Sequence, residues 1–243
     1  MIPEYYKNFN NIFAHSSVPW QQNILKKFLK RIGVKDFHLI ADIGSGIGNN
    51  VETLSKFTGH ITAVDISPAA LDALKRKYSG LISDLSVLSA DATKLPLDKE
   101  TFDVVVLTET LEHCENPEKV LSECVRILKS GGSIIVSAPN YLNPAGLWKK
   151  VWDSTHQKST WDAWGNHQDG KENLFTSVKL KGLVKSQKIK TIEDRGGDVL
   201  RSWMPFLKKY YEFIDRHPFL GIGKLWPVKY VMMNYFILGE KLS

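Results

Sequence analysis

Residues 39–48 read Leu39-Ile40-Ala41-Asp42-Ile43-Gly44-Ser45-Gly46-Ile47-Gly48. The stretch begins as an apolar run with the length of one buried strand, and then places glycine at every second position. Glycine has no Cβ, so it adopts positive φ and lets a ligand lie directly against the backbone. A helical pattern follows. A strand, a glycine turn and a helix N-terminus in this order predict the first ligand-binding corner of a doubly wound α/β sheet.

The spacing of the glycines excludes the dinucleotide-binding fingerprint. That fingerprint requires glycine at the first, third and sixth positions of the loop. Counted from Gly44 the sixth position is Asn49, and counted from Gly46 it is Val51. The pattern that is present, Asp42-x-Gly44-x-Gly46-x-Gly48, would on its own also fit a tight strand-to-helix turn without a ligand.

The composition favours one folded domain with a moderately basic surface. The chain has 243 residues, of which 43% are hydrophobic and 24% are charged, and these fractions are ordinary for a globular protein. The formal net charge of +6 permits an anionic partner, such as nucleic acid, a phosphorylated substrate or an acidic lipid surface. The charge alone does not identify which of these partners is bound.

Cysteine usage and hydropathy indicate a cytoplasmic protein. Cys114 and Cys124 lie on one predicted helical stretch without metal-ligand spacing, so we expect reduced packing side chains. Residues 1–11 are polar and aromatic, unlike a secretory signal. No apolar run approaches the ~20 residues that a membrane-spanning helix needs.

A second acidic position follows the next predicted strand. Residues 60–65 form an apolar strand pattern that ends on Asp65. In a doubly wound fold an acid at this place faces the ribose of a bound nucleotide, where a carboxylate accepts hydrogen bonds from both hydroxyls. An exposed acid at a strand end is the alternative. Ser67 and Pro68 then suit the N-cap and the first turn of a helix.

Further landmarks follow in register as far as residue 140. They are Ala90-Asp91-Ala92 after a short strand at 85–89, Leu95-Pro96-Leu97 with Phe102-Asp103-Val104-Val105, Thr108-Glu109 with Glu112-His113, and Lys129-x-Gly131-Gly132 with Pro139-Asn140. Together with the glycine pattern after Asp42, they resemble the class I S-adenosylmethionine (SAM)-dependent methyltransferases. The likeness is to the methyltransferase type 11, or quinone-biosynthesis-like, branch of that family.

This resemblance implies SAM as cofactor and a set of residues that bind it. Asp91 would accept a hydrogen bond from the exocyclic amine of adenine, and the amide of Ala92 would donate to a ring nitrogen. Thr108 and Glu109 match the family position near the methionine part of the cofactor. The expected cofactor contacts are Asp42, Gly44, Ser45, Gly46, Gly48, Asp65, Ile66, Asp91, Ala92, Thr108 and Glu109.

His113 and Glu109 are the candidates for catalysis. His113 matches the Glu-His element of the quinone-biosynthesis-like branch, and an imidazole titrates near neutral pH. It could equally cap or pack against the next helix. His156 and His167 are further candidates for a proton acceptor. Their irregular spacing from nearby aspartates argues against a metal site, so we expect no metal.

The resemblance also implies the architecture. We expect an α/β fold with a doubly wound, Rossmann-like sheet of seven strands, of which the last is antiparallel. Within one methyltransferase domain, residues 1–36 would form an N-terminal helical cap, with helices over 5–13 and 20–32. Residues 37–140 would form the SAM-binding core, and residues 141–243 the substrate-side half.

Periodicity and turn residues set the boundaries of the remaining elements. Helices are expected over 47–57, 68–78 and 176–186, and from Pro117 to a basic last turn at Lys129 that a glycine stop at 131–132 ends. Strands are expected over 104–107, 133–138, 188–193 and 233–238.

The composition changes beyond residue 140, where six of the seven tryptophans lie. Two insertions, at about 141–173 and 195–228, interrupt the pattern, and segments of this length commonly serve as lids or binding segments. Residues 205–216 have the pattern of an amphipathic helix with a broad aromatic face. It either packs on the core or, through 199–228, forms an apolar pocket or a peripheral contact with the inner membrane face.

The leading hypothesis is SAM-dependent methyl transfer to a small or lipid-linked acceptor at oxygen. A soluble sugar or natural-product methyltransferase is one alternative, and a SAM-binding module without turnover is another. The intact glycine loop, Asp65 and Asp91 disfavour the last alternative. The Pro-Pro-aromatic tetrad of DNA amino-methyltransferases does not follow the fourth predicted strand, so we expect no nucleic acid as substrate.

Overall fold

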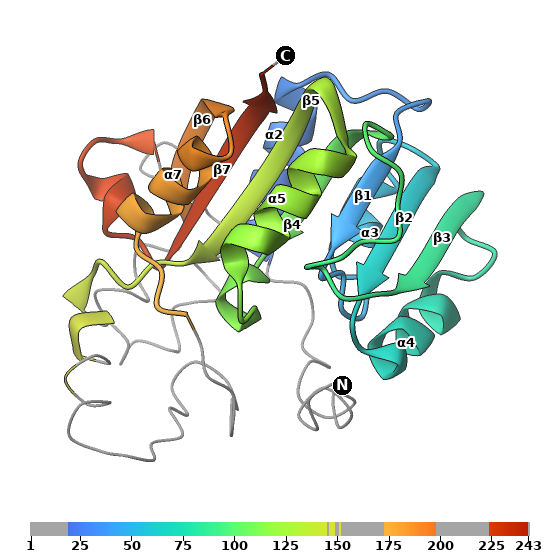
Figure 1. The fold of residues 1–243 in the computed structure, drawn as a ribbon, viewed down its shortest axis with the longest axis horizontal. Helices are drawn as coiled ribbons and strands as arrows, with labels where there is room; N and C mark the ends of the chain where they lie inside the picture. Colours follow the sequence, from blue (N-terminus) through green and yellow to red (C-terminus); the bar gives the residue numbers. More distant parts are fainter. Residues whose placement is uncertain (1–18, 145, 149–150, 152–172, 198–223, 243) are drawn as a thin grey trace.

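A seven-stranded sheet organises the part of the chain that the computed structural model describes, residues 19–144, 146–148, 151, 173–197 and 224–242 (Figure 1). The strands are β1 (Ile40–Ile43), β2 (His60–Asp65), β3 (Asp84–Ser89), β4 (Phe102–Thr108), β5 (Leu128–Pro139), β6 (Ile189–Gly197) and β7 (Asn234–Lys241). The helices are α2 (Pro19–Arg31), α3 (Val51–Leu54), α4 (Pro68–Tyr78), α5 (Pro117–Ile127), α7 (Ser177–Ser186) and the 3₁₀ segments η2 (Leu111–His113) and η5 (Val228–Tyr230).

The order of the strands confirms the predicted doubly wound sheet. Across the sheet the strands follow the order β3-β2-β1-β4-β5-β7-β6. The first five strands along the chain pair in parallel. Strand β7 is antiparallel to both of its neighbours, β5 and β6. The order reverses at β1, which lies between β2 and β4, and ligands of open α/β sheets bind at such a reversal.

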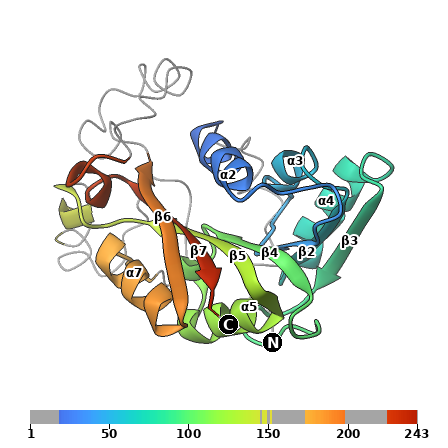
Figure 2. The same cartoon turned by 90° about the horizontal axis from the view of Figure 1, so that it is seen from above.

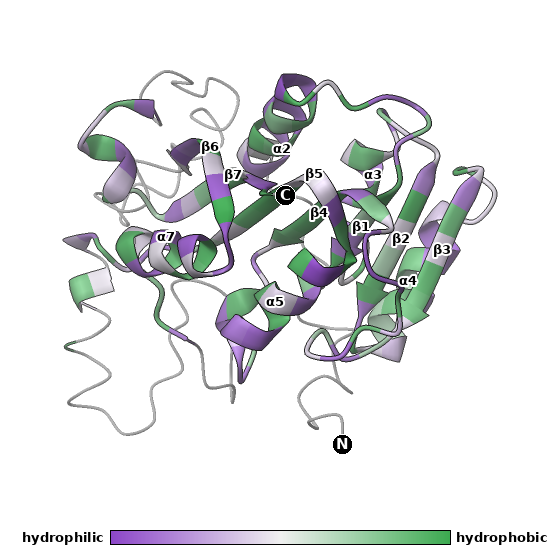
Figure 3. Ribbon diagram, turned by 45° about the horizontal axis from the view of Figure 1, so that its top comes forward, coloured by the Kyte–Doolittle hydropathy of each residue, from purple (hydrophilic) through white to green (hydrophobic). Residues whose placement is uncertain are grey.

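Helices cover both faces of the sheet, and each face has its own apolar core. Figure 2 shows α2, α3 and α4 on one face and α5 and α7 on the other. Alternate residues of a strand point to opposite faces, so β4 sends Val104 and Val106 to the first core and Val105 and Leu107 to the second. The central strands are accordingly hydrophobic along much of their length in Figure 3, whereas α5 has one apolar and one polar side. This burial on both faces fixes the sheet that carries the site.

Helix α2 is attached to the sheet by one apolar stripe. Its buried side chains are Trp20, Ile24, Leu25, Phe28 and Leu29, which recur at helical spacing. The Trp20 ring meets the Phe236 ring of β7 edge to face, with centroids 5.8 Å apart. The helix predicted over 20–32 is therefore confirmed within one residue at each end.

Several predicted boundaries are wrong. Helix α3 covers only 51–54 instead of 47–57, because the residues before it form the glycine loop. Helix α5 ends at Ile127, and Lys129 to Gly132 belong to β5 rather than to a basic last turn with a glycine stop. Leu128 already pairs with Phe102 and is fully buried, so the strand begins there. Cys114 precedes α5, and only Cys124 lies on it.

Strand β6 also shortens the second predicted insertion. It continues past Glu193 to Gly197, where Arg195 pairs with Phe236 of β7. The insertion therefore begins after 197 instead of at 195. The helices predicted over 5–13 and 205–216, together with His156 and His167, lie outside the described residues. Among the helices within the described ranges, none has the length and apolar character to cross a membrane.

Candidate active site

The carboxyl ends of the parallel strands bring the predicted site residues to one edge of the sheet. In Figure 1 the arrowheads of β1, β2, β3 and β5 all point to this edge. The glycine loop follows β1, Asp65 ends β2 opposite Ser89 of β3, and Thr108 ends β4. Because parallel strands share one direction, residues far apart in sequence meet here.

The glycines of the loop have different structural roles. Gly44, Gly46 and Gly48 have φ of 72°, 52° and 86°, in the left-handed region that glycine adopts without strain. A Cβ on Gly44 would lie 2.3 Å from Thr110 Oγ1, and one on Gly48 would lie 2.8 Å from Tyr78 Cε2. A Cβ on Gly46 would meet nothing within 4 Å. Gly44 and Gly48 therefore permit close packing, and Gly46 leaves bare backbone for a ligand to approach.

Asp65 holds the glycine loop in place. Its Oδ2 accepts a hydrogen bond from the Gly46 amide at 2.8 Å, and its Oδ1 accepts one from the Ser67 amide at 2.8 Å. Burial raises the pKa of Asp65, and the hydrogen bonds from Ser67, Gly46 and Ile66 oppose that rise. Each carboxylate oxygen has a second lone pair, so these contacts leave Asp65 able to accept from a ligand hydroxyl.

Asp42, at the third position of β1, is joined to the end of β4 by one side chain. Nδ2 of Asn50 donates to Asp42 Oδ1 at 3.0 Å and to Thr108 Oγ1 at 2.9 Å. Asp42 is completely buried, and burial raises its pKa to about 7. The hydrogen bond from Asn50 opposes the rise, and the charge of Asp65 adds to it. This arrangement places two predicted cofactor contacts side by side.

Two buried polar atoms of this loop have no hydrogen-bond partner within the described part of the chain. They are Asp42 Oδ2 and Ser45 Oγ. Buried polar atoms are paired in most proteins, because leaving one without a partner costs about 1–3 kcal/mol. The unpartnered oxygens of Asp42 and Ser45 fit a ligand that brings a cationic or hydrogen-bond-donating group to the glycine loop.

Asp91 and Ala92 follow β3 at the neighbouring strand end. Asp91 is exposed, and its Oδ1 accepts from the Thr93 amide at 2.7 Å. That hydrogen bond lowers the pKa of Asp91, so the group is a carboxylate at neutral pH. Ala90 N–H donates to Asp65 O at 3.0 Å, which ties this turn to the end of β2. The structure thus places both predicted acids on adjacent strand ends.

Glu109 adopts a left-handed backbone conformation directly after β4, with φ of 50°. Its Oε1 accepts from Ser137 Oγ of β5 at 2.7 Å, and its Oε2 accepts from Asn234 Nδ2 of β7 at 2.5 Å. Its amide donates to Ser137 O at 3.2 Å. The carboxylate is therefore held from two strands and oriented toward β5 and β7, away from the glycine loop.

His113 lies one 3₁₀ turn farther along, in η2. Its side chain is 24% exposed, and Nε2 is 3.9 Å from Glu112 Oε1. Its amide donates to Thr110 O at 3.1 Å. The same Thr110 packs over Gly44, so η2 begins at the glycine loop.

Three residues that sequence reasoning missed complete the site. Asn50 joins Asp42 to Thr108, and Ser137 and Asn234 hold Glu109. The available signals were weak: Ser137 is a polar residue inside the apolar run of β5, and Asn234 begins the last strand. Nothing in the spacing of Asn50 distinguished it from Asn49.

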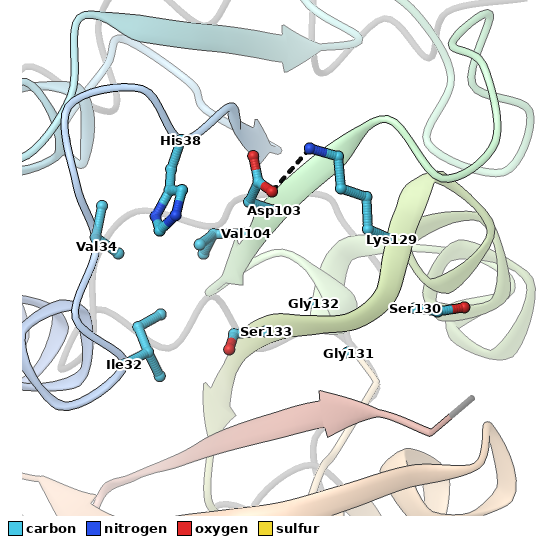
Figure 4. A pocket seen from close by; sticks show the side chains of 10 residues that line it. All are labelled: Ile32, Val34, His38, Asp103, Val104, Lys129, Ser130, Gly131, Gly132 and Ser133. Atoms are coloured by element: carbon cyan, nitrogen blue, oxygen red, sulfur yellow. Dashed lines mark hydrogen bonds and ion pairs between the residues drawn. The ribbon is translucent and has the colours of Figure 1, made fainter.

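A cavity of ≈ 210 Å³ lies at the opposite edge of the sheet (Figure 4). His38, Asp103, Lys129 and the Gly131–Ser133 segment line it, and Lys129 Nζ lies 2.7 Å from Asp103 Oδ1. The other oxygen of Asp103 accepts from the Leu39 amide at 2.9 Å. No predicted site residue lines this cavity.

Comparison with known proteins shows that the core of the chain is similar to methyltransferases. Residues 41–136 match the family model described as a methyltransferase domain. The chain is similar to the demethylmenaquinone methyltransferase of Clavibacter sepedonicus, at 34% identity over 97 residues, which are 40% of this chain and 39% of that protein. It is also similar to the ubiquinone biosynthesis O-methyltransferase of Coxiella burnetii, at 29% identity over 116 residues, 48% of this chain and 49% of that protein.

These matches cover less than half of the length of either relative. Among solved structures, a SAM-dependent methyltransferase from Methanosarcina mazei is similar over 88% of this chain and 97% of its own, with a TM-score of 0.63 and 17% identity. At that identity the likeness establishes the fold. The family and the fold together imply SAM as the methyl donor.

Proposed function

We propose that the protein transfers a methyl group from SAM to an oxygen atom of a small or lipid-linked acceptor, because residues 41–136 match the methyltransferase-domain model. The observation that carries the proposal is the pair of acids around the glycine loop. Asp65 holds the Gly46 amide, and Asp42 keeps one buried oxygen without a partner among the described residues.

The residues at the strand ends match the chemical groups of SAM one by one. Asp65 faces the loop from the end of β2, where a carboxylate can accept from ribose hydroxyls. Asp91 and the Ala92 amide would bind the adenine edge. Asp42 Oδ2 would accept from the ammonium of the methionine part, and Thr108 lies nearby because Asn50 donates both to its hydroxyl and to Asp42 Oδ1. Bound here, SAM would supply the methyl group of its sulfonium, and the demethylated product would be a neutral thioether.

The chain's own task is then to align the acceptor, exclude water and receive a proton. An oxygen nucleophile loses its proton as the new carbon–oxygen bond forms, so a base must lie near it. We assign this role to Glu109, because Ser137 and Asn234 fix its carboxylate at the strand ends. His113 in η2 is the alternative base, since its imidazole is partly exposed next to the same edge.

Exposed apolar side chains beside this edge support an apolar acceptor. Leu147 and Trp148 are 64% and 60% exposed, and Trp226 is 78% exposed. Asn140 ties the segments that carry them together, because its Nδ2 donates to Tyr230 O at 2.8 Å from the end of β5. Large exposed apolar side chains near a site mark contact with an apolar ligand or a lipid surface. Trp226 belongs to the described part of the segment 199–228, through which we propose the membrane contact.

Calorimetric titration of SAM and of S-adenosylhomocysteine is the first test. We expect both to bind with micromolar affinity, and methyl uptake to follow with quinone, phenolic-lipid or sugar acceptors. Binding without uptake by any acceptor class would favour the non-catalytic module. Failure of both to bind would overturn the proposal. Uptake by sugars alone would favour the soluble-substrate alternative.

Vesicle flotation tests the lipid surface separately. We expect the protein to float with vesicles that contain anionic lipid, and Trp226→Ala to weaken this binding. Phe37→Ala is the matched control, because Phe37 is 69% exposed at the other edge of the sheet. Equal flotation of both variants and the wild type would remove Trp226 from the contact, and no flotation at all would argue against a membrane partner.

A further inference from the structure

Helix α2 contacts the glycine loop through a polar side chain. Gln22 Nε2 donates to Asn50 Oδ1 at 3.3 Å, and Thr53 Oγ1 of α3 donates to Gln22 Oε1 at 2.6 Å. Asn50 in turn donates to Asp42 and Thr108. A continuous chain of hydrogen bonds thus runs from α3 through α2 to the acid of β1.

Donors and acceptors in this series of hydrogen bonds can be arranged in only one consistent way. Asn50 uses both N–H groups, because a carboxylate has only acceptors and the Thr108 hydroxyl accepts here. Its oxygen must then face Gln22, which must offer its own N–H group. The Gln22 oxygen is left for the Thr53 hydroxyl. Turning over either amide would bring two donors or two acceptors together, so each member fixes the next.

Helix α2 is firmly placed where Gln22 leaves it. Trp20, two residues earlier, is 7% exposed and packs edge to face on Phe236. Ile24 and Leu25 are buried against the sheet on the following turn. Gln22 therefore reaches Asn50 from a fixed backbone, which is the condition for a side chain to position another.

This series of hydrogen bonds ends at the Asp42 carboxylate, whose Oδ2 is the buried oxygen without a partner among the described residues. Asn50 binds only Oδ1 of Asp42, so this oxygen is held and Oδ2 is left for a ligand donor. We propose that Gln22 is a positioning residue of the cofactor site, which acts through Asn50 to hold Asp42 and Thr108 in the arrangement that receives the ammonium end of SAM. This inference rests on the proposed function, and it assigns to α2 a part in cofactor affinity.

The tests are Gln22→Ala and Asn50→Ala, with the neighbours Gln21→Ala and Asn49→Ala as matched controls. Neither control side chain makes a hydrogen bond within the described residues. We expect SAM affinity to fall about tenfold or more in Asn50→Ala and about threefold in Gln22→Ala, because each loses hydrogen bonds in a partly buried chain. Adding Gln22→Ala to Asn50→Ala should cause little further loss, since the two act in series.

The pH dependence distinguishes positioning from a general loop defect. Burial and the charge of Asp65 raise the pKa of Asp42 to about 7, and the hydrogen bond from Asn50 opposes that rise, so Asn50→Ala should raise the pKa further. The ratio of variant to wild-type Kd should then fall as pH rises from 7 to 9, where Asp42 is ionised in both proteins. The ratio cancels the ionisation of SAM itself. A loop defect would give the same ratio at each pH.

The outcomes separate the two proposals. If wild-type protein binds SAM and the Gln22 and Asn50 variants match their controls, the positioning role is overturned while the proposed function stands. If wild-type protein does not bind SAM, both fail. Thermal unfolding of each variant checks the fold, and Gln22→Ala leaves the loop residues themselves intact if Asn50→Ala does not fold.

Discussion

The parallel strands begin at one side of the sheet, here called the amino edge, and end at the other, the carboxyl edge. Both edges carry acidic side chains, but these side chains differ in their hydrogen-bond partners. At the amino edge the acidic side chains have partners: Asp103 lies 2.7 Å from Lys129, Asp84 lies 2.8 Å from His60, and Glu100 lies 3.4 Å from Lys241. At the carboxyl edge Asp42 and Ser45 each keep a buried polar atom without a partner among the described residues. The amino edge has the cavity of ≈ 210 Å³, and the carboxyl edge has the candidate site.

This difference is why we place the candidate site by unmet hydrogen-bonding capacity rather than by cavity volume. Asp103 uses both oxygens within the protein, so the cavity beside it offers a ligand little that is not already bound. The glycine loop instead combines bare backbone at Gly46 with an acceptor at Asp42. Substitutions matched across the two edges can test whether this contrast holds.

The largest effect is expected at Gly44. In Gly44→Ala the new Cβ would lie 2.3 Å from Thr110 Oγ1, at a φ of 72°. The matched change at the amino edge is Gly33→Ala, where φ is 66° and nothing lies within 4 Å of the new Cβ. We expect Gly44→Ala to lower the free energy of unfolding by about 3–4 kcal/mol and Gly33→Ala by about 1 kcal/mol, measured by urea denaturation. Equal losses would mean that Thr110 moves aside freely.

Asp65 should show the next largest effect. We expect Asp65→Ala to weaken SAM binding about 100-fold in calorimetry, because a charged acceptor for two hydroxyls and the anchor of the Gly46 amide are both lost. Asp84→Ala removes an acid at the opposite end of the sheet, where it pairs with His60. The control should bind SAM like the wild type. Unchanged affinity in Asp65→Ala would disprove the ribose assignment.

Glu109 and Glu100 form a third matched pair, since both adopt positive φ, of 50° and 52°. We expect Glu109→Gln to lower turnover about tenfold or more with SAM affinity nearly unchanged, because the amide cannot accept a proton. Glu100→Gln should leave turnover unchanged. Full activity in Glu109→Gln would move the base to His113, and His113→Ala would then be the variant that loses turnover.

The smallest effect is expected at the amino edge itself. Burial raises the pKa of Asp103, but the Lys129 ammonium and the Leu39 amide together lower it below its usual value. A lowered pKa stabilises the fold above about pH 4, and the gain disappears as pH falls through the folded pKa. Lys129→Met should therefore cost less than about 1 kcal/mol at pH 7, since Lys129 is 41% exposed, and nothing near pH 2. Thermal unfolding without denaturant, at pH 7 and near pH 2, measures the stability difference between this variant and the wild type. SAM affinity should not change.

The sequence predicts the main frame of the site because its signals are local. The strand pattern places Asp65 at a strand end, and the positive φ of Gly44, Gly46 and Gly48 follows from glycines at alternate positions. The error at Lys129 has the same origin, since a basic residue before two glycines also suits a helix end. Pairing of Leu128 with Phe102, a tertiary contact, decided that boundary.

The connections within the site depend on tertiary placement and could not be predicted. Asn50 meets Thr108, 58 residues away, and Asn234 meets Glu109, 125 residues away. A side-chain amide has the same local propensities whether it faces solvent or a buried carboxylate. Gln22 and Gln21 are likewise equivalent in sequence, and only the rotation of α2 on the sheet separates them.

Strand β7 follows β6 in the chain and yet lies between β5 and β6. During synthesis, β6 therefore leaves the ribosome before the strand that joins it to the sheet, and it must wait unpaired until β7 inserts between two elements already made. The same insertion delivers Asn234 to Glu109. The nascent protein should thus assemble its glycine loop and its strands β1 to β5 first, and gain the oriented carboxylate only in the last step of folding.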